Sequence, residues 1–120
     1  MIKIPDLPEH ERPIEVRYEI AARAYNEAAK VARSYKENKS IVFDKMVKEV
    51  MQFDPKLPFN KAQMMARSSP AWQAFVDRLL EAADEAGNKK SELKAIEIEA
   101  DRLKQAAISL ATERKYSRYS

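Results

Sequence analysis

The stretch DEAGNKKSEL, residues 84–93, decides the fold because it contains Gly87, the only glycine among 120 residues. A glycine can end a helix, since it adopts the left-handed conformation that helix C-caps use. Ser91 would then cap a second helix. Gly87 can also lie inside a helix, at a cost of about 1 kcal/mol. The chain therefore either turns back here as a hairpin or continues as one helix.

The apolar pattern around this stretch favours the continuous helix. From Trp72 to Leu110, steps of three and four residues alternate, and only Lys89 among the twelve positions is not apolar. A continuous helix must keep this register, whereas two helices joined by a loop have no reason to keep it. A helix over 70–115 would be roughly 69 Å long at 1.5 Å per residue. A hairpin with a break at 87–90 stays the alternative.

Prolines and a second apolar pattern organise the first third of the chain. The prolines of MIKIPDLPEHERP predict an extended arm over 1–12 and a helix that begins at Pro13. Between Ile14 and Tyr35, isoleucine, alanine and tyrosine recur at alternating steps of four and three residues. This spacing predicts a helix over 13–36 with one apolar face.

Two shorter helices are expected before the long one. The polar segment KENKS ends the first helix, and Ser40 caps a helix over 41–53. Pro55 then stops this helix. Asn60 and Gln63 resemble a capping box for a helix over 60–67, which packs against the start of the long helix at Trp72.

The sequence therefore predicts an all-α fold. We expect one helical domain over 13–115, built as a hairpin-like bundle with a long C-terminal helix, coiled-coil-like packing and a basic tail over 116–120. One glycine, with 45% apolar and 34% charged residues, suits amphipathic helices. The first helix can cover only about half of the long one, which predicts a homo-oligomer. Its interface residues would be Leu93, Ile96, Leu103 and Leu110.

Candidate chemistry is sparse. There is no cysteine, the single histidine is His10 in the proline-rich arm, and one glycine cannot form a phosphate-binding loop. The carboxylates of Asp77, Glu81, Asp84 and Glu85 share a helix face, but nearby lysines and arginines favour a solvated face over a metal site. We predict a non-enzyme without metal or cofactor. No apolar run approaches a membrane span, so we expect a cytoplasmic protein with no membrane partner.

Basic and tyrosine residues alternate at the C-terminal end. From 102 to 120 there are five basic residues and one acidic residue, a local charge of +4 against +3 for the whole chain. Cations follow phosphates and aromatic rings stack on bases in proteins that bind single strands. The residues predicted to bind nucleic acid are Lys104, Arg114, Lys115, Tyr116, Arg118 and Tyr119. An ordinary basic helix end, favoured by the helix dipole, is the alternative.

The second half, from ARSSPAWQAF to LATERKYSR (residues 66–118), resembles small helical bacteriophage proteins encoded beside single-strand annealing recombinases and single-strand binding proteins. The similarity lies in the long alternating helix, the ATER turn at 111–114 and the basic tail, and Gly87 departs from it. The resemblance implies a phage accessory factor of DNA recombination or replication, located in the host cytoplasm. Its partners would be single-stranded DNA and a phage or host recombination protein.

Two functions follow from these patterns. The first is a non-catalytic accessory of DNA metabolism that binds nucleic acid weakly through its C-terminal end and oligomerises through the long helix. The alternative is a helical adaptor, or an inhibitor of a host protein, whose surface binds another protein and not nucleic acid.

Overall fold

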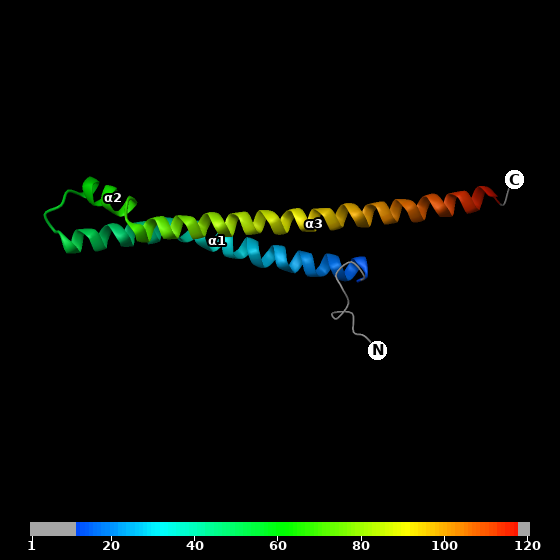
Figure 1. Ribbon diagram of the computed structural model, residues 1–120, viewed down its shortest axis with the longest axis horizontal. Helices are drawn as coiled ribbons and strands as arrows, with labels where there is room; N and C mark the ends of the chain where they lie inside the picture. Colours follow the sequence, from blue (N-terminus) through cyan, green and yellow to red (C-terminus); the bar gives the residue numbers. More distant parts are fainter. Residues whose placement is uncertain (1–11, 118–120) are drawn as a thin grey trace, which may run out of the picture. The chain divides into compact units, whose positions relative to one another are not determined.

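The computed structural model describes residues 12–117 and contains three helices there (Figure 1). They are α1 (Ile14–Phe53), α2 (Phe59–Arg67) and α3 (Pro70–Ser117). The fold is all-α, and α1 and α3 pack against each other. The predicted arm over 1–12 lies outside the described residues except for its last residue. Of the predicted tail over 116–120, Tyr116 and Ser117 belong to α3, while 118–120 lie outside.

The long helix α3 passes through Gly87 without a break. Gly87 does not have the positive φ that a helix C-cap would require. A Cβ atom built at this position would meet no atom within 4 Å, so the glycine does not serve a close contact either. The hairpin alternative at 87–90 therefore does not describe this chain.

The prediction of separate helices over 13–36 and 41–53 is wrong, because α1 is continuous across KENKS. The segment contains neither glycine nor proline, so nothing in it breaks a helix. The Asn38 side chain donates a hydrogen bond of 2.9 Å to the Ser34 carbonyl one turn earlier, which is compatible with helix. Aromatic contacts from Tyr35 and Phe43 to α3 then hold α1 on both sides of the segment. Ser40 is an ordinary exposed helix residue, not a cap.

The contacts divide the chain into two compact units, where the sequence predicts one domain. The first unit joins the chain up to Tyr25 with the chain from Asn88 onward, and the second unit is Asn26–Gly87. Each unit thus contains part of α1 and part of α3. Gly87 is the last residue of the second unit, so the only glycine lies where the two units meet along α3.

The second unit contains the buried apolar core of α2. Ala62 and Ala66 of α2 are fully buried and pack with Val47 of α1, which is 3% exposed. The partly buried side chains around them are Phe43, Met46, Val50, Met51 and Leu57. Small alanines allow α2 to approach α1 closely. The sequence predicts that the helix over 60–67 packs at Trp72, but its methionines Met64 and Met65 are 65% and 55% exposed.

An aromatic group joins α1 to the start of α3 in the same unit. The Trp72 ring lies 4.9 Å from the Phe43 ring and 5.5 Å from the Phe75 ring, centre to centre. Phe75 also contacts Tyr35, at 5.7 Å. Trp72 is only 7% exposed, so this end of α3 belongs to the buried core. Such aromatic pairs contribute about 0.5–1.5 kcal/mol beyond the burial of their surface.

An ion pair between Arg17 and Glu99 connects α1 and α3 in the first unit. The Arg17 guanidinium donates two hydrogen bonds to the two Glu99 carboxylate oxygens, at 2.9 and 2.8 Å. This paired geometry is specific to arginine and fixes the register of the helices. The hydrogen bonds from Arg17 lower the pKa of the Glu99 carboxyl; partial desolvation opposes this shift and the positive charge of Arg17 adds to it.

Candidate functional site

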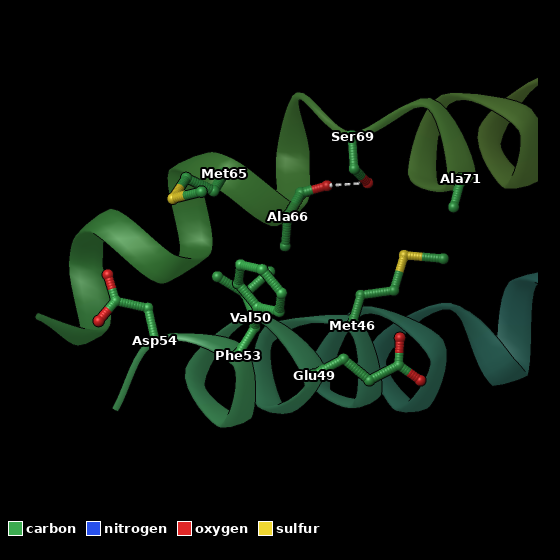
Figure 2. Close-up of a pocket in the computed structure, with 9 residues that line it drawn as sticks. All are labelled: Met46, Glu49, Val50, Phe53, Asp54, Met65, Ala66, Ser69 and Ala71. Carbon is green, nitrogen blue, oxygen red and sulfur yellow. Dashed lines mark hydrogen bonds between the residues drawn. The ribbon is translucent and has the colours of Figure 1, made fainter. Parts of the chain in front are cut away.

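An apolar groove in the second unit is the strongest candidate for a binding site. It has a volume of about 400 Å³ and lies between the end of α1 and the segment that joins α2 to α3 (Figure 2). From α1 and the residue after it come Met46, Glu49, Val50, Phe53 and Asp54, and from the other side come Met65, Ala66, Ser69 and Ala71.

The groove wall on the α1 side exists because the helix ends abruptly. Pro55 disfavours helical backbone at Asp54, and α1 ends at Phe53. The following turn is closed by a hydrogen bond of 3.1 Å from the Leu57 amide to the Asp54 carbonyl. The Asp54 carboxylate also accepts a bond of 3.3 Å from the Lys56 amide. The turn brings α2 back over Val47, and the last turn of α1 remains as one wall.

The opposite wall is held by Ser69. Its hydroxyl donates a hydrogen bond of 2.7 Å to the Ala66 carbonyl, which Figure 2 shows as a dashed line. The same hydroxyl accepts a bond of 3.2 Å from the Trp72 amide, so Ser69 caps α3 at Pro70. Asn60, predicted to cap α2, instead accepts a bond from the adjacent Lys61 amide, and α2 begins one residue earlier at Phe59.

The surface at this groove is unusually apolar for a side open to solvent. Phe53 is 94% exposed and Met65 is 55% exposed. Phe59 and Met64, close by in the sequence, are 58% and 65% exposed. An exposed group of large apolar side chains marks an interaction surface more often than chance exposure of a single residue does.

The charge of the groove is negative. Among the residues that the structure describes, Glu49 and Asp54 are the charged ones that line it, and no lysine or arginine does so. The Ser69 hydroxyl is occupied by the helix cap. The groove therefore offers apolar contact and two carboxylates, which suits the binding of an apolar surface that carries positive charge.

The residues predicted to bind nucleic acid are spread around the end of α3. Lys104, Arg114, Lys115 and Tyr116 are all exposed, and Tyr116 is 71% exposed. At 100° per residue, Arg114 and Tyr116 point about 160° apart around the helix axis. They therefore do not form one face. Arg118 and Tyr119 lie outside the described residues.

The residues predicted to form an oligomer interface fall into two groups. Ile96 is 7% exposed and Leu93 is half-buried, because α1 already covers this part of α3. Leu103 and Leu110 are 54% and 50% exposed. Within residues 12–117, the second group is the one that presents substantial exposed surface.

Sequence reasoning missed the groove. The predicted helix over 41–53 ends at Phe53, two residues before Pro55, and this position at a helix end is the signal in the sequence for an exposed side chain. The adjacent Met64 and Met65 were a second signal, because two neighbouring residues on a helix point about 100° apart and a short helix rarely buries both. Among residues 12–117, no group of three or more histidine, aspartate or glutamate side chains is arranged to hold a metal ion.

Comparison with known proteins gives no match: no family model, curated protein or solved structure matches this chain. Within the described part of the chain, no helix combines the length and apolar character needed to cross a membrane. The fold and the surfaces described above are therefore the basis for a functional proposal.

Proposed function

We propose that this chain is a protein-interaction module that binds an amphipathic helix of another protein in the groove beside Phe53. The observation that carries this proposal is the 94% exposure of Phe53 on the wall of an apolar groove. Binding of an amphipathic helix in an apolar groove is a recurrent mode of peptide recognition. The partner helix would be apolar on one face and basic beside it, because Glu49 and Asp54 line the groove.

Burial of the exposed apolar side chains of the groove would contribute to such a contact. Burying a phenylalanine side chain contributes about 1.5–3 kcal/mol, and Val50 and Met65 add partly exposed apolar surface. A large apolar side chain in a pocket is the usual centre of a binding surface, and its loss weakens binding strongly. Phe53 is therefore the residue whose replacement should matter most.

A labelled synthetic helix tests this proposal. The probe is a fluorescent 18-residue peptide of leucine and lysine with leucine at helical spacing, and the readout is anisotropy. Phe53→Lys should weaken binding by at least tenfold, since it removes the apolar anchor and adds a repelling charge. Ile41→Lys is the matched control, because Ile41 is also an exposed α1 residue at 66% but lies outside the groove.

Two results would contradict the proposal. Equal affinity of the Phe53→Lys and Ile41→Lys variants would place peptide binding elsewhere. Equal affinity for a leucine–glutamate peptide of the same pattern would show that the groove carboxylates do not select a basic partner. Both variants change residues that are largely exposed, so circular dichroism should show an unchanged helix content.

The second candidate function is the accessory role in DNA recombination or replication. It is supported by the exposed end of α3, where residues 101–117 carry four basic and two acidic side chains beside the exposed Tyr116. Because these groups surround the helix, binding would rest on charge more than on base stacking at one face. The phage origin implied by the resemblance belongs to this candidate.

A labelled single-stranded oligonucleotide separates the two candidates. The accessory role predicts binding at about 50 mM salt that weakens steeply at 200 mM, and that is lost on deletion of residues 112–120. Absence of binding at low salt would remove this candidate. The Phe53→Lys variant serves as a control here, since a DNA site at the end of α3 does not involve it.

A further inference from the structure

The end of α3 carries a second apolar surface that no other part of residues 12–117 covers. We define the C-terminal stripe as Leu103, Ala107 and Leu110. All residues from 101 to 117 are exposed, whereas every position of the same helix face from Trp72 to Ala100 is buried or half-buried. The change follows from where α1 begins: with Arg17 paired to Glu99, α1 has only one further turn before its first residue, Ile14.

The C-terminal stripe continues an existing interface. Ile96 and Ala100 on the covered part of α3 are followed by Leu103, Ala107 and Leu110 at the same steps of three and four residues. Where α1 no longer covers α3, this face of α3 would be expected to become polar, because solvent-exposed helix faces are usually polar. Here the face stays apolar while its partner helix ends. This pattern is typical of a helix face that contacts another helix or an apolar groove.

The charges around the two uncovered surfaces are opposite. Residues 101–117 carry Arg102, Lys104, Arg114 and Lys115 against two acidic residues, which gives a net charge of +2. Arg114 follows Leu110 at the next step of four residues and so extends the C-terminal stripe with a cation. The charged residues that line the groove are both carboxylates. The stripe thus combines an apolar face with basic neighbours, which complements an apolar groove lined by two carboxylates.

We propose that the C-terminal stripe of one copy binds in the groove of a second copy of this chain. The inference rests on the proposed function, because it uses the same groove, and it names a partner for it. The contact joins two different surfaces, so it is heterologous: each copy donates a stripe and accepts one. Such contacts build rings where the rotation closes and open chains where it does not. A copy whose groove is filled in this way is closed to other partner helices.

Complementation between two variants tests this arrangement. The groove variant is Phe53→Lys, and the stripe variant is Leu103→Glu with Leu110→Glu. Their matched controls are Ile41→Lys and the double change Ile98→Glu with Ile108→Glu, which replaces residues 46% and 49% exposed on other faces of α3. Molar mass is measured by sedimentation velocity or light scattering from about 1 to 200 µM.

The expected results are specific to a heterologous contact. The wild-type chain and both controls should associate as concentration rises, and each variant alone should stay monomeric or associate at least tenfold more weakly. An equimolar mixture of the two variants should form a one-to-one heterodimer, because one intact groove meets one intact stripe. Salt should weaken the association, since opposite charges contribute to it.

Three results would overturn the proposal. A groove variant that associates like wild type would indicate contact between two stripes. A mixture that stays monomeric would show that groove and stripe do not recognise each other. A wild-type chain that is monomeric throughout would exclude any self-association in this range. If the wild-type chain is monomeric but still binds the leucine–lysine peptide, only the self-association proposal fails. If it neither self-associates nor binds the peptide, the proposed function fails as well.

Discussion

Replacement of Gly87 by alanine should stabilise the protein, because a continuous helix makes no use of this glycine. The residue lies in the interior of α3 without a positive φ, and an added Cβ would meet nothing within 4 Å. There is thus no steric cost to subtract. Alanine is favoured over glycine in a helix interior by about 0.8–1.0 kcal/mol. The expected gain in the free energy of unfolding of Gly87→Ala is close to this full difference.

The thermal shift can be estimated from the chain length. At about 2.1 cal/mol/K per residue, 120 residues have an unfolding entropy of roughly 0.25 kcal/mol/K. A gain of about 0.9 kcal/mol then raises Tm by roughly 3–4 °C. Urea titration followed by circular dichroism at 222 nm measures the free energy, and a thermal scan measures Tm.

A matched change in the opposite direction completes the test. Ala83 is exposed on α3, one turn before Gly87, so Ala83→Gly should cost about the same 0.8–1.0 kcal/mol. The free energy of unfolding of the double variant should be close to that of wild type, because the gain at Gly87 and the loss at Ala83 nearly cancel. A Gly87→Ala variant that is destabilised by 1 kcal/mol would refute the reasoning, because it would indicate a left-handed cap at this position and a broken helix.

Three further changes test other parts of the fold. Ser69→Ala removes the cap of α3 and should cost about 1 kcal/mol in urea unfolding, while Ser68→Ala, one residue earlier, should cost clearly less. Ala62→Leu adds three carbons at a position that is 0% exposed and should cost about 1–3 kcal/mol, whereas Ala74→Leu on an exposed face of α3 should be near neutral. Glu99→Gln should remove a pH-dependent contribution to the free energy of unfolding. The pKa of Glu99 is lower in the folded protein than its ordinary value of 4.5. This contribution is therefore fully present above pH 4.5 and is lost as the pH falls through the folded pKa. The difference in unfolding free energy between wild type and Glu99→Gln should therefore shrink below pH 4.5, and a constant difference from pH 7 to 3 would contradict it.

The apolar pattern keeps its register across KENKS as it does across Gly87. Tyr35, Val42 and Met46 follow one another at steps of seven and four residues, so the apolar face keeps its phase across residues 36–40. The polar composition of KENKS favours a break, but the segment contains neither glycine nor proline. The structure shows that the phase of the apolar face was the better guide at both places, because tertiary packing holds a helix through a stretch of weak local preference.

The two candidate surfaces could not be predicted in the same way, because each depends on where a neighbouring element ends. The spacing of apolar residues from Trp72 onward predicts which face of α3 is apolar. It does not show that α1 stops covering this face near Glu99. The exposure of Phe53 likewise depends on α2 packing through Ala62 and Ala66 and not through its methionines. Periodicity identifies a face, whereas its exposure is set by the lengths and turns of other segments.

The position of Gly87 connects the stability prediction to the binding proposals. Gly87 is the last residue of the second unit, which holds the groove, and the C-terminal stripe belongs to the first unit. A Cβ atom built at Gly87 would meet nothing within 4 Å, so an alanine fits at this boundary between the units along the sequence of α3. If each surface works within its own unit, Gly87→Ala should raise stability and leave both the peptide affinity and the self-association constant unchanged. A gain in stability accompanied by a severalfold change in self-association would instead show that bending of α3 at its glycine is part of how the copies meet.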